Sequence, residues 1–236
     1  MNNKTKTKTV NHKTAHNKTA KTGIRHLYGY YHQAIAQLKQ LDFVVLLLLR
    51  VYLAPIFIVA GYNKWQNFAD MVAWYGDSDW GLGLPFPTLM VALTIFAELF
   101  GGIALLFGVL TRFFSVILSV TMGVAIAKVH WVNGWFAIAP TDTDTSITRF
   151  FGWFSQDIAI QTAQQADDVA QRLTKAREIL QEYGNYDWLT ETGNFVVLNN
   201  GIEFATTYLV MLLVLVIYGA GRYVGVDYWF AKKLLR

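Results

Sequence analysis

The sequence predicts an all-α membrane protein: a bundle of four transmembrane helices with one amphipathic helix outside the bilayer. Three observations support this. Of the 236 residues, 54% are hydrophobic and only 15% are charged, with a mean hydropathy of +0.30, which is outside the usual range for soluble domains. Four apolar windows are each long enough to cross a hydrocarbon core of about 30 Å as a helix. The chain between the last two windows has the periodicity of an amphipathic helix.

The four windows cover residues 41–61, 86–110, 113–131 and 202–221. Glycine, proline or polar residues separate them, and the second and third are so close in sequence that they predict a helical hairpin. The membrane domain is therefore expected to occupy residues 39–236.

Residues 1–38 are polar, and their lysines are set among threonine, asparagine and histidine. Such a segment has too few apolar residues to bury, so we expect a disordered basic cytoplasmic tail; a specific binding arm is the alternative. The C-terminus is also basic, and Arg112 lies in the hairpin turn. This distribution of Lys and Arg predicts that both termini face the cytoplasm.

The basic residues gather at the two ends of the chain, which argues against nucleic-acid binding. The sequence has no cysteine, so disulfides, thiolate metal sites and CxxC chemistry are excluded within it. A redox role would need a bound cofactor or a partner.

The expected extracytoplasmic insertion, residues 132–201, contains the amphipathic stretch. Its predicted helix has Ser155 as N-cap and Gly184 as C-cap, with apolar residues at helical spacing. It would lie on the outer face or cover the mouth of the bundle; a simple packing element is the alternative. Asp142 and Asp144, just before it, are typical of a polar loop with turns.

Two charges lie inside the predicted spans. Counting residues from the helix ends places both Arg50 and Glu98 near the bilayer midplane. Unpaired charges there are costly, so we expect a buried ion pair between the two. The pair would either fix helix register or form the charged floor of a site for a small polar or redox molecule.

Small side chains let membrane helices approach closely. The sequence places such residues on one stripe of each of two predicted spans, and they are expected to mediate helix packing: Ala97, Gly101, Gly102, Ser115, Ser119, Gly123 and Ala127.

Polar residues also gather at the predicted outer ends of the helices: Lys64, Lys128, His130, Asn133, Asn200 and Glu203. Taken singly, such residues often snorkel to the interface. Taken together, they form a candidate site for an anion, a metal or a quinone head group. His130 alone does not make a metal site, and only Glu203 or Met122 are candidate companions. No sequence motif assigns a catalytic residue, so enzymatic activity is left open.

Several motifs carry a family resemblance: the mid-helix Arg50, G-x-x-K at Gly61, E-x-x-G-G at Glu98, H-W-x-N-G at His130, and G-x-G-R-Y at Gly219. With these motifs the chain resembles the DoxX family of small four-helix membrane proteins, over about residues 40–136 and 195–230. The resemblance implies the fold more directly than an activity.

The stretch NYDWLTETGNFVVLNNGIEF resembles the HvfX branch of that family. This branch implies a multi-pass protein of the bacterial cytoplasmic (inner) membrane that accompanies the maturation of copper-binding modified peptides. Its partners would be the lipid bilayer and other membrane or peptide-modifying proteins of the same system. An oligomer is compatible with a unit of this size.

The wider family includes the membrane subunit of thiosulfate:quinone oxidoreductases, so a quinone-linked redox subunit is the second functional hypothesis. Copper and quinone are the corresponding candidate ligands, and neither is assigned by the sequence. A channel or carrier is a third reading, which four helices packed on small residues disfavour.

Overall fold

A computed structural model describes residues 28–33, 35–140, 149–150, 152–153 and 156–234. The predicted tail up to residue 27, the loop with Asp142 and Asp144, and the predicted N-cap Ser155 lie outside these ranges. The elements of the described part are helical apart from an isolated bridge between Ile138 and Leu198. The predicted all-α fold class is confirmed.

The elements of the bundle follow in chain order. They are η1 (Lys39–Leu41), α2 (Asp42–Gln66), α3 (Phe68–Gly76), α4 (Pro87–Ile95), the π-helical η2 (Phe96–Phe100), α5 (Gly101–Phe107), α6 (Thr111–Val124), the π-helical η3 (Ala125–His130) and η4 (Trp131–Asn133). The insertion contributes α8 (Gln156–Tyr183) and α9 (Tyr186–Thr190), and the chain ends with α10 (Glu203–Tyr218) and α11 (Val226–Leu234).

Three described helices are long and apolar enough to cross a membrane: Tyr28–Gln66, Pro87–Phe107 and Thr111–Asn133. The fourth predicted span, residues 202–221, corresponds to α10. This helix is apolar but has only 16 residues, about 24 Å at 1.5 Å per residue. The four-span topology therefore stays a prediction, with α10 as its shortest member.

One span boundary and two short helices differ from the sequence prediction. The first span continues through Gly61 to Gln66, because the glycine lies against a neighbouring helix and does not end its own. The loop that follows contains α3, whose Tyr75 is buried. The C-terminal helix α11 was also not predicted, since it is short and carries Lys232 and Lys233 in its last turn.

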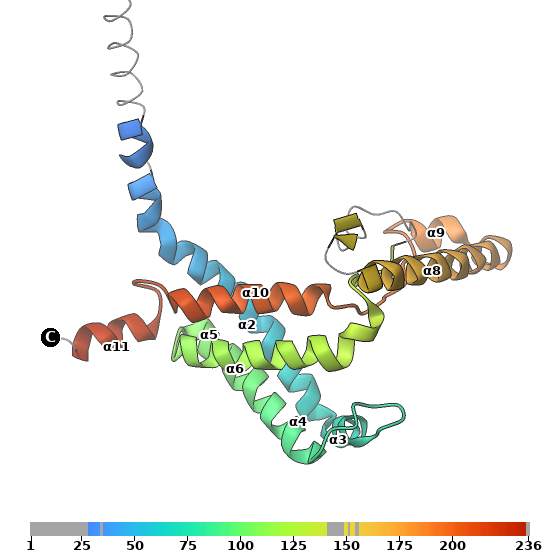
Figure 1. Cartoon of the computed structure of the whole chain (residues 1–236), viewed down its shortest axis with the longest axis horizontal. Coiled ribbons are helices and arrows are strands. Elements are labelled where there is room, and N and C mark those ends of the chain that lie inside the picture. Colours follow the sequence, from blue (N-terminus) through green and yellow to red (C-terminus); the bar gives the residue numbers. More distant parts are fainter. Residues whose placement is uncertain (1–27, 34, 141–148, 151, 154–155, 235–236) are drawn as a thin grey trace, which may run out of the picture.

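In Figure 1, α6 and α10 lie side by side and α2 crosses them, while α8 and α9 project from the end of the bundle where η3 stops. The core between the spans is aliphatic and aromatic, with Leu53, Phe57, Leu118, Leu212 and Leu215 each at most 1% exposed. Large apolar side chains also cover the outside of the spans, as lipid-facing helices require. Examples are Leu48, Phe100, Val120, Val210 and Ile217, which are 51–66% exposed.

Glycines set the closest helix contacts. A Cβ on Gly102 would come within 2.9 Å of the Ala54 carbonyl oxygen and the Ile58 nitrogen, both in α2. Gly61 makes the reverse contact, with a Cβ position 2.7 Å from the Leu99 nitrogen. The predicted close packing of the second span on the first is thus present at Gly102.

The other predicted packing residues divide into two groups. Gly101 faces the Leu118 side chain of α6, Ala97 is buried, and Ser115 is fully buried. The Ser119 hydroxyl donates to the Ser115 carbonyl, one turn earlier in the same helix. By contrast, no atom lies within 4 Å of a Cβ built on Gly123, and Ala127 is exposed. The stripe on α6 therefore serves packing only in its first half.

The insertion is joined to the bundle by two antiparallel segments, residues 134–139 and 197–203. Their backbones exchange hydrogen bonds, including Ala139 N–H to the Val197 oxygen (3.0 Å) and Gly201 N–H to the Phe136 oxygen (3.0 Å). The predicted amphipathic helix is present as α8, with Ala166 and Leu173 buried. Gly184 follows its last residue, and its N–H donates to Leu180.

The glycine contacts give a prediction about stability. Gly102→Ala should destabilise the fold by about 1–3 kcal/mol, because the new methyl group meets backbone atoms that must move. Gly123→Ala is the matched control in a helix, and it should be neutral or slightly stabilising because its methyl group meets open space. Thermal unfolding of the detergent-solubilised protein measures both, and equal melting temperatures for the two variants would contradict the assignment.

Candidate functional site

Arg50 lies at one end of the bundle, fully buried and enclosed by backbone carbonyl groups. Its Nε donates to the oxygen of Leu105 (2.7 Å). The two terminal nitrogens donate to the oxygens of Leu106 (3.0 Å), Ala220 (2.8 Å) and Val224 (3.3 and 3.4 Å). The guanidinium therefore ties α2 to the end of α5 and to the turn after α10.

The predicted ion pair between Arg50 and Glu98 is wrong, and helix register explains why. Gly61 lies against Leu99, and Gly102 lies against Ala54. Continuing this antiparallel register toward the start of α2 brings Arg50 beside the last turn of α5. Counting from the ends of predicted windows could not show this offset.

Glycines make room for the guanidinium. Gly108, with φ +68°, ends α5, and a Cβ there would meet Arg50 Nη2 and the Gly225 backbone. Asp227 completes this end of the bundle: its carboxylate accepts from the N–H groups of Leu110 (2.7 Å) and Thr111 (2.8 Å) at the start of α6.

The partner of Glu98 is Lys64, on the opposite side of the membrane-embedded region from Arg50. The Lys64 Nζ lies 2.7 Å from Glu98 Oε2, and the two side chains are 24% and 5% exposed. Lys64 is 14 residues beyond Arg50 on the same helix, about 21 Å along its axis. The two charges of the predicted pair thus sit at different depths, and each has found another partner.

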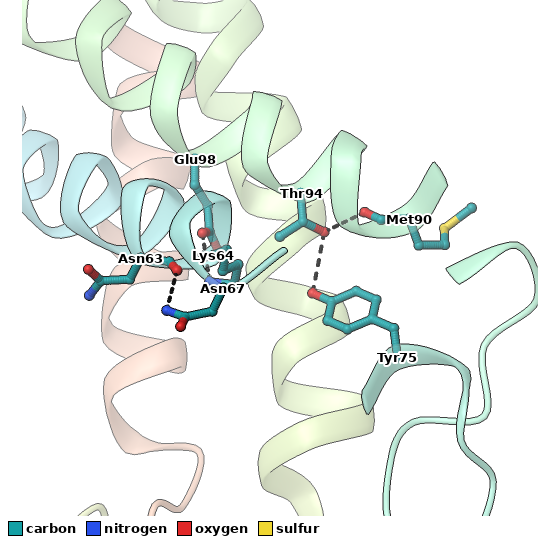
Figure 2. A network of polar contacts seen from close by, with 7 residues as sticks. All are labelled: Asn63, Lys64, Asn67, Tyr75, Met90, Thr94 and Glu98. Atoms are coloured by element: carbon teal, nitrogen blue, oxygen red, sulfur yellow. Dashed lines mark hydrogen bonds and ion pairs between the residues drawn. The ribbon is translucent and has the colours of Figure 1, made fainter. Parts of the chain in front are cut away.

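Further polar groups adjoin this ion pair, as Figure 2 shows. The Tyr75 hydroxyl lies 3.4 Å from Thr94 Oγ1, which donates to the Met90 carbonyl (2.9 Å) one turn earlier in α4. Asn67, just after α2, donates to the Asn63 carbonyl (2.9 Å). Short helix α3 therefore brings a phenol against the helix that carries Glu98.

Lys64, Glu98, Tyr75 and Thr94 border a cavity of about 660 Å³, here called the Glu98 cavity. Its walls come from the end of α2, from α3 and the following loop, and from α4, η2, α6 and η3. The polar lining consists of Lys64, Tyr75, Thr94, Glu98, Thr121 and His130. Most of the remaining lining is aliphatic or aromatic and includes Met71, Trp74, Leu93, Phe96, Val116, Val120 and Val124. A volume of this size and a lining with few polar groups are typical of sites for small lipophilic molecules.

Two π-helical segments bring charged or titratable side chains into this cavity. Glu98 lies within η2, and His130 is the last residue of η3. A π-helical turn accommodates an extra residue, so it shifts the side chains after it around the axis; such turns are frequent at functional sites. Neither segment has a glycine or proline inside it, so no residue type marks their positions.

His130 is held by its Nδ1, which lies 2.7 Å from the Asn200 carbonyl oxygen. A carbonyl only accepts, so this contact assigns the proton of a neutral imidazole to Nδ1 and leaves Nε2 as an acceptor. His130 also lines the Glu98 cavity. A histidine oriented in this way can hold or transfer a proton at Nε2.

The predicted outer-end polar site is assembled in part. The Asn200 carbonyl accepts from both His130 and the Asn133 amide (3.2 Å). The Glu203 carboxylate accepts from the Ala137 N–H (3.0 Å), so it supports the neighbouring turn. Lys64 lies across the Glu98 cavity, where it pairs with Glu98. Lys128 is exposed and does not line that cavity.

Within the described ranges, no group of three or more His, Cys, Asp or Glu side chains could hold a metal ion. His130 therefore has neither predicted companion in a ligand cluster there: Glu203 binds a backbone N–H, and Met122 is buried in the core. Sequence reasoning placed Thr94 on the same stripe as Glu98 but missed Tyr75, although the apolar periodicity of residues 68–76 could have indicated α3.

Comparison with known proteins agrees with this architecture. Residues 45–131 match the DoxX family. The putative oxidoreductase CatD of Bacillus subtilis (strain 168) is 35% identical over 83 residues, which make up 35% of this chain and 58% of the relative. The match thus spans less than two thirds of that relative's length. No solved structure gives a significant match. Together with the apolar spans, these findings indicate a DoxX-like membrane protein.

The buried ion pair yields a prediction that a double-mutant cycle can check. Lys64→Met and Glu98→Leu should each destabilise by about 2–3 kcal/mol, somewhat less than a fully buried pair because Lys64 is partly exposed. The double variant should recover much of the loss, since neither charge is then left alone. Unfolding of the purified protein in detergent is the measurement.

The exposed pair of Lys175 and Glu178, which lies 2.9 Å apart on α8, is the control for this cycle. Its coupling should stay below about 0.5 kcal/mol. Strictly additive losses at Lys64 and Glu98 would show that the two side chains do not act as a pair.

A second prediction concerns the loop after α3, which brings Leu82 and Leu84 to the cavity wall. Hydrogen bonds from the Trp80 and Asp79 N–H groups lower the pKa of Asp77 below its usual 3.8. The Asp77 carboxylate therefore stabilises the loop fully at pH values above about 3.8, and this stabilisation is lost as the pH falls through the lowered pKa of Asp77. Hydrogen exchange of residues 77–84, corrected for the intrinsic pH effect, should accelerate on acidification. Asp77→Asn should already exchange faster at neutral pH, whereas Asp70→Asn in α3 should not.

Proposed function

We propose that the chain is a membrane redox subunit that binds a quinone in the Glu98 cavity. The observation that carries the proposal is the composition of that cavity: a buried carboxylate, an ammonium group and an oriented histidine within otherwise apolar walls of about 660 Å³. A quinone has the matching chemistry, an apolar ring and tail with two carbonyl oxygens at the head.

The polar groups of the cavity support the binding of a quinone head group. Lys64 and His130 come from different walls, so a ring between them could be contacted from both sides. The oxygens of a quinone accept hydrogen bonds, and those of a quinol also donate them. Lys64 supplies a donor, while Nε2 of neutral His130 supplies an acceptor and becomes a donor once protonated.

Proton transfer gives Glu98 and His130 a role in the reaction. Oxidation of a quinol to a quinone releases two electrons and two protons. Glu98 and Nε2 of His130 are each able to accept one proton, and Lys64 stabilises the Glu98 anion before that transfer. The sequence has no cysteine, so no thiol of this chain can accept the electrons. They pass instead to a partner redox protein.

The comparisons support this reading in two ways. The segment that matches the DoxX family, residues 45–131, includes Lys64, Glu98 and His130. The Bacillus relative is named a putative oxidoreductase. We further propose that the protein is a multi-pass protein of the bacterial cytoplasmic membrane with both termini inside. The basic residues Arg112, Arg222 and Lys232, which lie at the end of the bundle opposite Lys64, support that orientation.

The accessory role in a copper-binding peptide system, with the HvfX branch, stays a prediction. It would depend on surfaces for other proteins rather than on a metal cluster in the described ranges. The exposed face of α8, which carries Asp168, Arg172 and Lys175, is the surface that such a role would use.

Quinone binding can be tested by narrowing the cavity. Titration of the purified protein with a short-chain benzoquinone, followed by tryptophan fluorescence, gives the dissociation constant; Trp74 in the cavity wall is the reporter. Val120→Trp places an indole at the cavity and should weaken binding at least about tenfold, or ~1.4 kcal/mol. Glu98→Gln should still bind quinone, but in membranes that contain the partner redox protein it should slow quinol oxidation, because the carboxylate no longer takes a proton.

Val210→Trp on α10 is the matched control. Val120 and Val210 are exposed to similar extents, 63% and 56%, but only Val120 lines the cavity. Unchanged affinity in Val120→Trp, or an equal loss in both variants, would rule out the Glu98 cavity as the quinone site.

A further inference from the structure

The end of the bundle opposite the Glu98 cavity contains a second cavity, of about 570 Å³, here called the Arg112 cavity. It lies between the start of α2, the start of α6, the turn after α10, and α11. Its apolar lining includes Leu46, Leu110, Phe113, Tyr218 and Ala231, and its charged lining consists of Asp42, Arg112, Arg222 and Asp227. Nothing in the proposed quinone chemistry uses it.

The two arginines keep much of their binding capacity. Arg112 donates one hydrogen bond, to the Ile217 carbonyl (3.1 Å), and its guanidinium lies against Gly219, whose φ of +74° folds the turn beneath it. Arg222 is 3.7 Å from Asp42, a loose contact between side chains that are 60% and 45% exposed. Each guanidinium has five N–H donors, so several remain for a ligand.

The acidic members of the lining are partly committed. Asp227 accepts from two backbone N–H groups at the start of α6, and it also lies in the field of Arg50. Asp42 is left as the one carboxylate that competes directly for Arg222. With the basic end of α11 nearby, this end of the bundle favours an anion.

The surroundings place the Arg112 cavity at the level of lipid head groups. Helix α11 exposes Trp229 and Phe230, and Tyr223 precedes it. Lys232 lies over the Trp229 ring at 5.1 Å from its centroid. Aromatic side chains and lysines of this kind mark the boundary between hydrocarbon and water. Basic pockets between helices at that boundary hold the head groups of anionic lipids.

We infer that the Arg112 cavity binds an anionic phospholipid, with the phosphate between Arg112 and Arg222 and an acyl chain against the apolar lining. The occupant is a lipid and not free phosphate, because the lining of the cavity is mainly apolar and because the cavity opens among residues that face the hydrocarbon. The lipid would join α2, α6 and α11 at the end of the bundle where the chain turns.

The experiment uses the full chain purified in a neutral detergent. Adding phosphatidylglycerol should raise the melting temperature, whereas phosphatidylcholine or inorganic phosphate should not. Native mass spectrometry measures the affinity for phosphatidylglycerol. The double variant Arg112→Gln and Arg222→Gln should bind this lipid about 25-fold more weakly, which is ~2 kcal/mol at about 1.4 kcal/mol per tenfold. The matched control is the double variant Arg172→Gln and Lys175→Gln, which removes two exposed charges from α8.

Two further variants separate lipid binding from folding. Arg112→Lys with Arg222→Lys keeps the charge and should retain most of the lipid. Asp42→Asn removes the competing carboxylate and should bind phosphatidylglycerol more tightly, an effect that loss of structure cannot produce. Equal effects of the two lipids on the wild-type protein would overturn the proposal. A phosphate effect as large as that of phosphatidylglycerol, or an equal loss in the α8 control, would do the same.

Discussion

The burial of the Arg50 guanidinium is the constraint on which the rest of the bundle depends. An arginine in the hydrocarbon region costs at least ~2.5–3.5 kcal/mol when it has no partners, so the chain must supply acceptors. It does so with carbonyl groups at the ends of α5 and α10, including those of Leu105 and Ala220. Because these acceptors come from two segments that are far apart in the sequence, the arginine can be satisfied in only one arrangement of α2, the end of α5 and the turn after α10.

This arrangement of the helices also determines the ion pair between Lys64 and Glu98. Once Arg50 lies beside the last turn of α5, the antiparallel register carries Lys64 to Glu98 about four helical turns away. The Glu98 cavity forms on the far side of this pair, where α3 folds back and Tyr75 contacts Thr94. The buried arginine and the buried carboxylate therefore lie on the same helix pair, and the contacts of Arg50 fix the position of Glu98.

Sequence patterns were sufficient for the all-α fold class, and they indicated that Arg50 and Glu98 are buried. They were insufficient for the pairing, because residue counts from window ends carry no information on how far one helix slides along another. They also could not locate η2 and η3, since a π-helical turn depends on tertiary packing and no residue type marks it. His130 and Asn200, predicted in one site, do meet, but through a backbone carbonyl that side-chain reasoning does not consider.

The paired segments at the base of the insertion have a consequence for the evolution of the chain. Backbone hydrogen bonds join the segment from Gly134 to Ala139 to the segment from Val197 to Glu203. They hold side by side the two points at which the insertion leaves and rejoins the bundle. The entropy of closing a loop grows only slowly with its length, so the segment between them can lengthen or shrink at little cost to the spans. The surface of α8 and α9 can therefore diversify while the membrane core keeps its register.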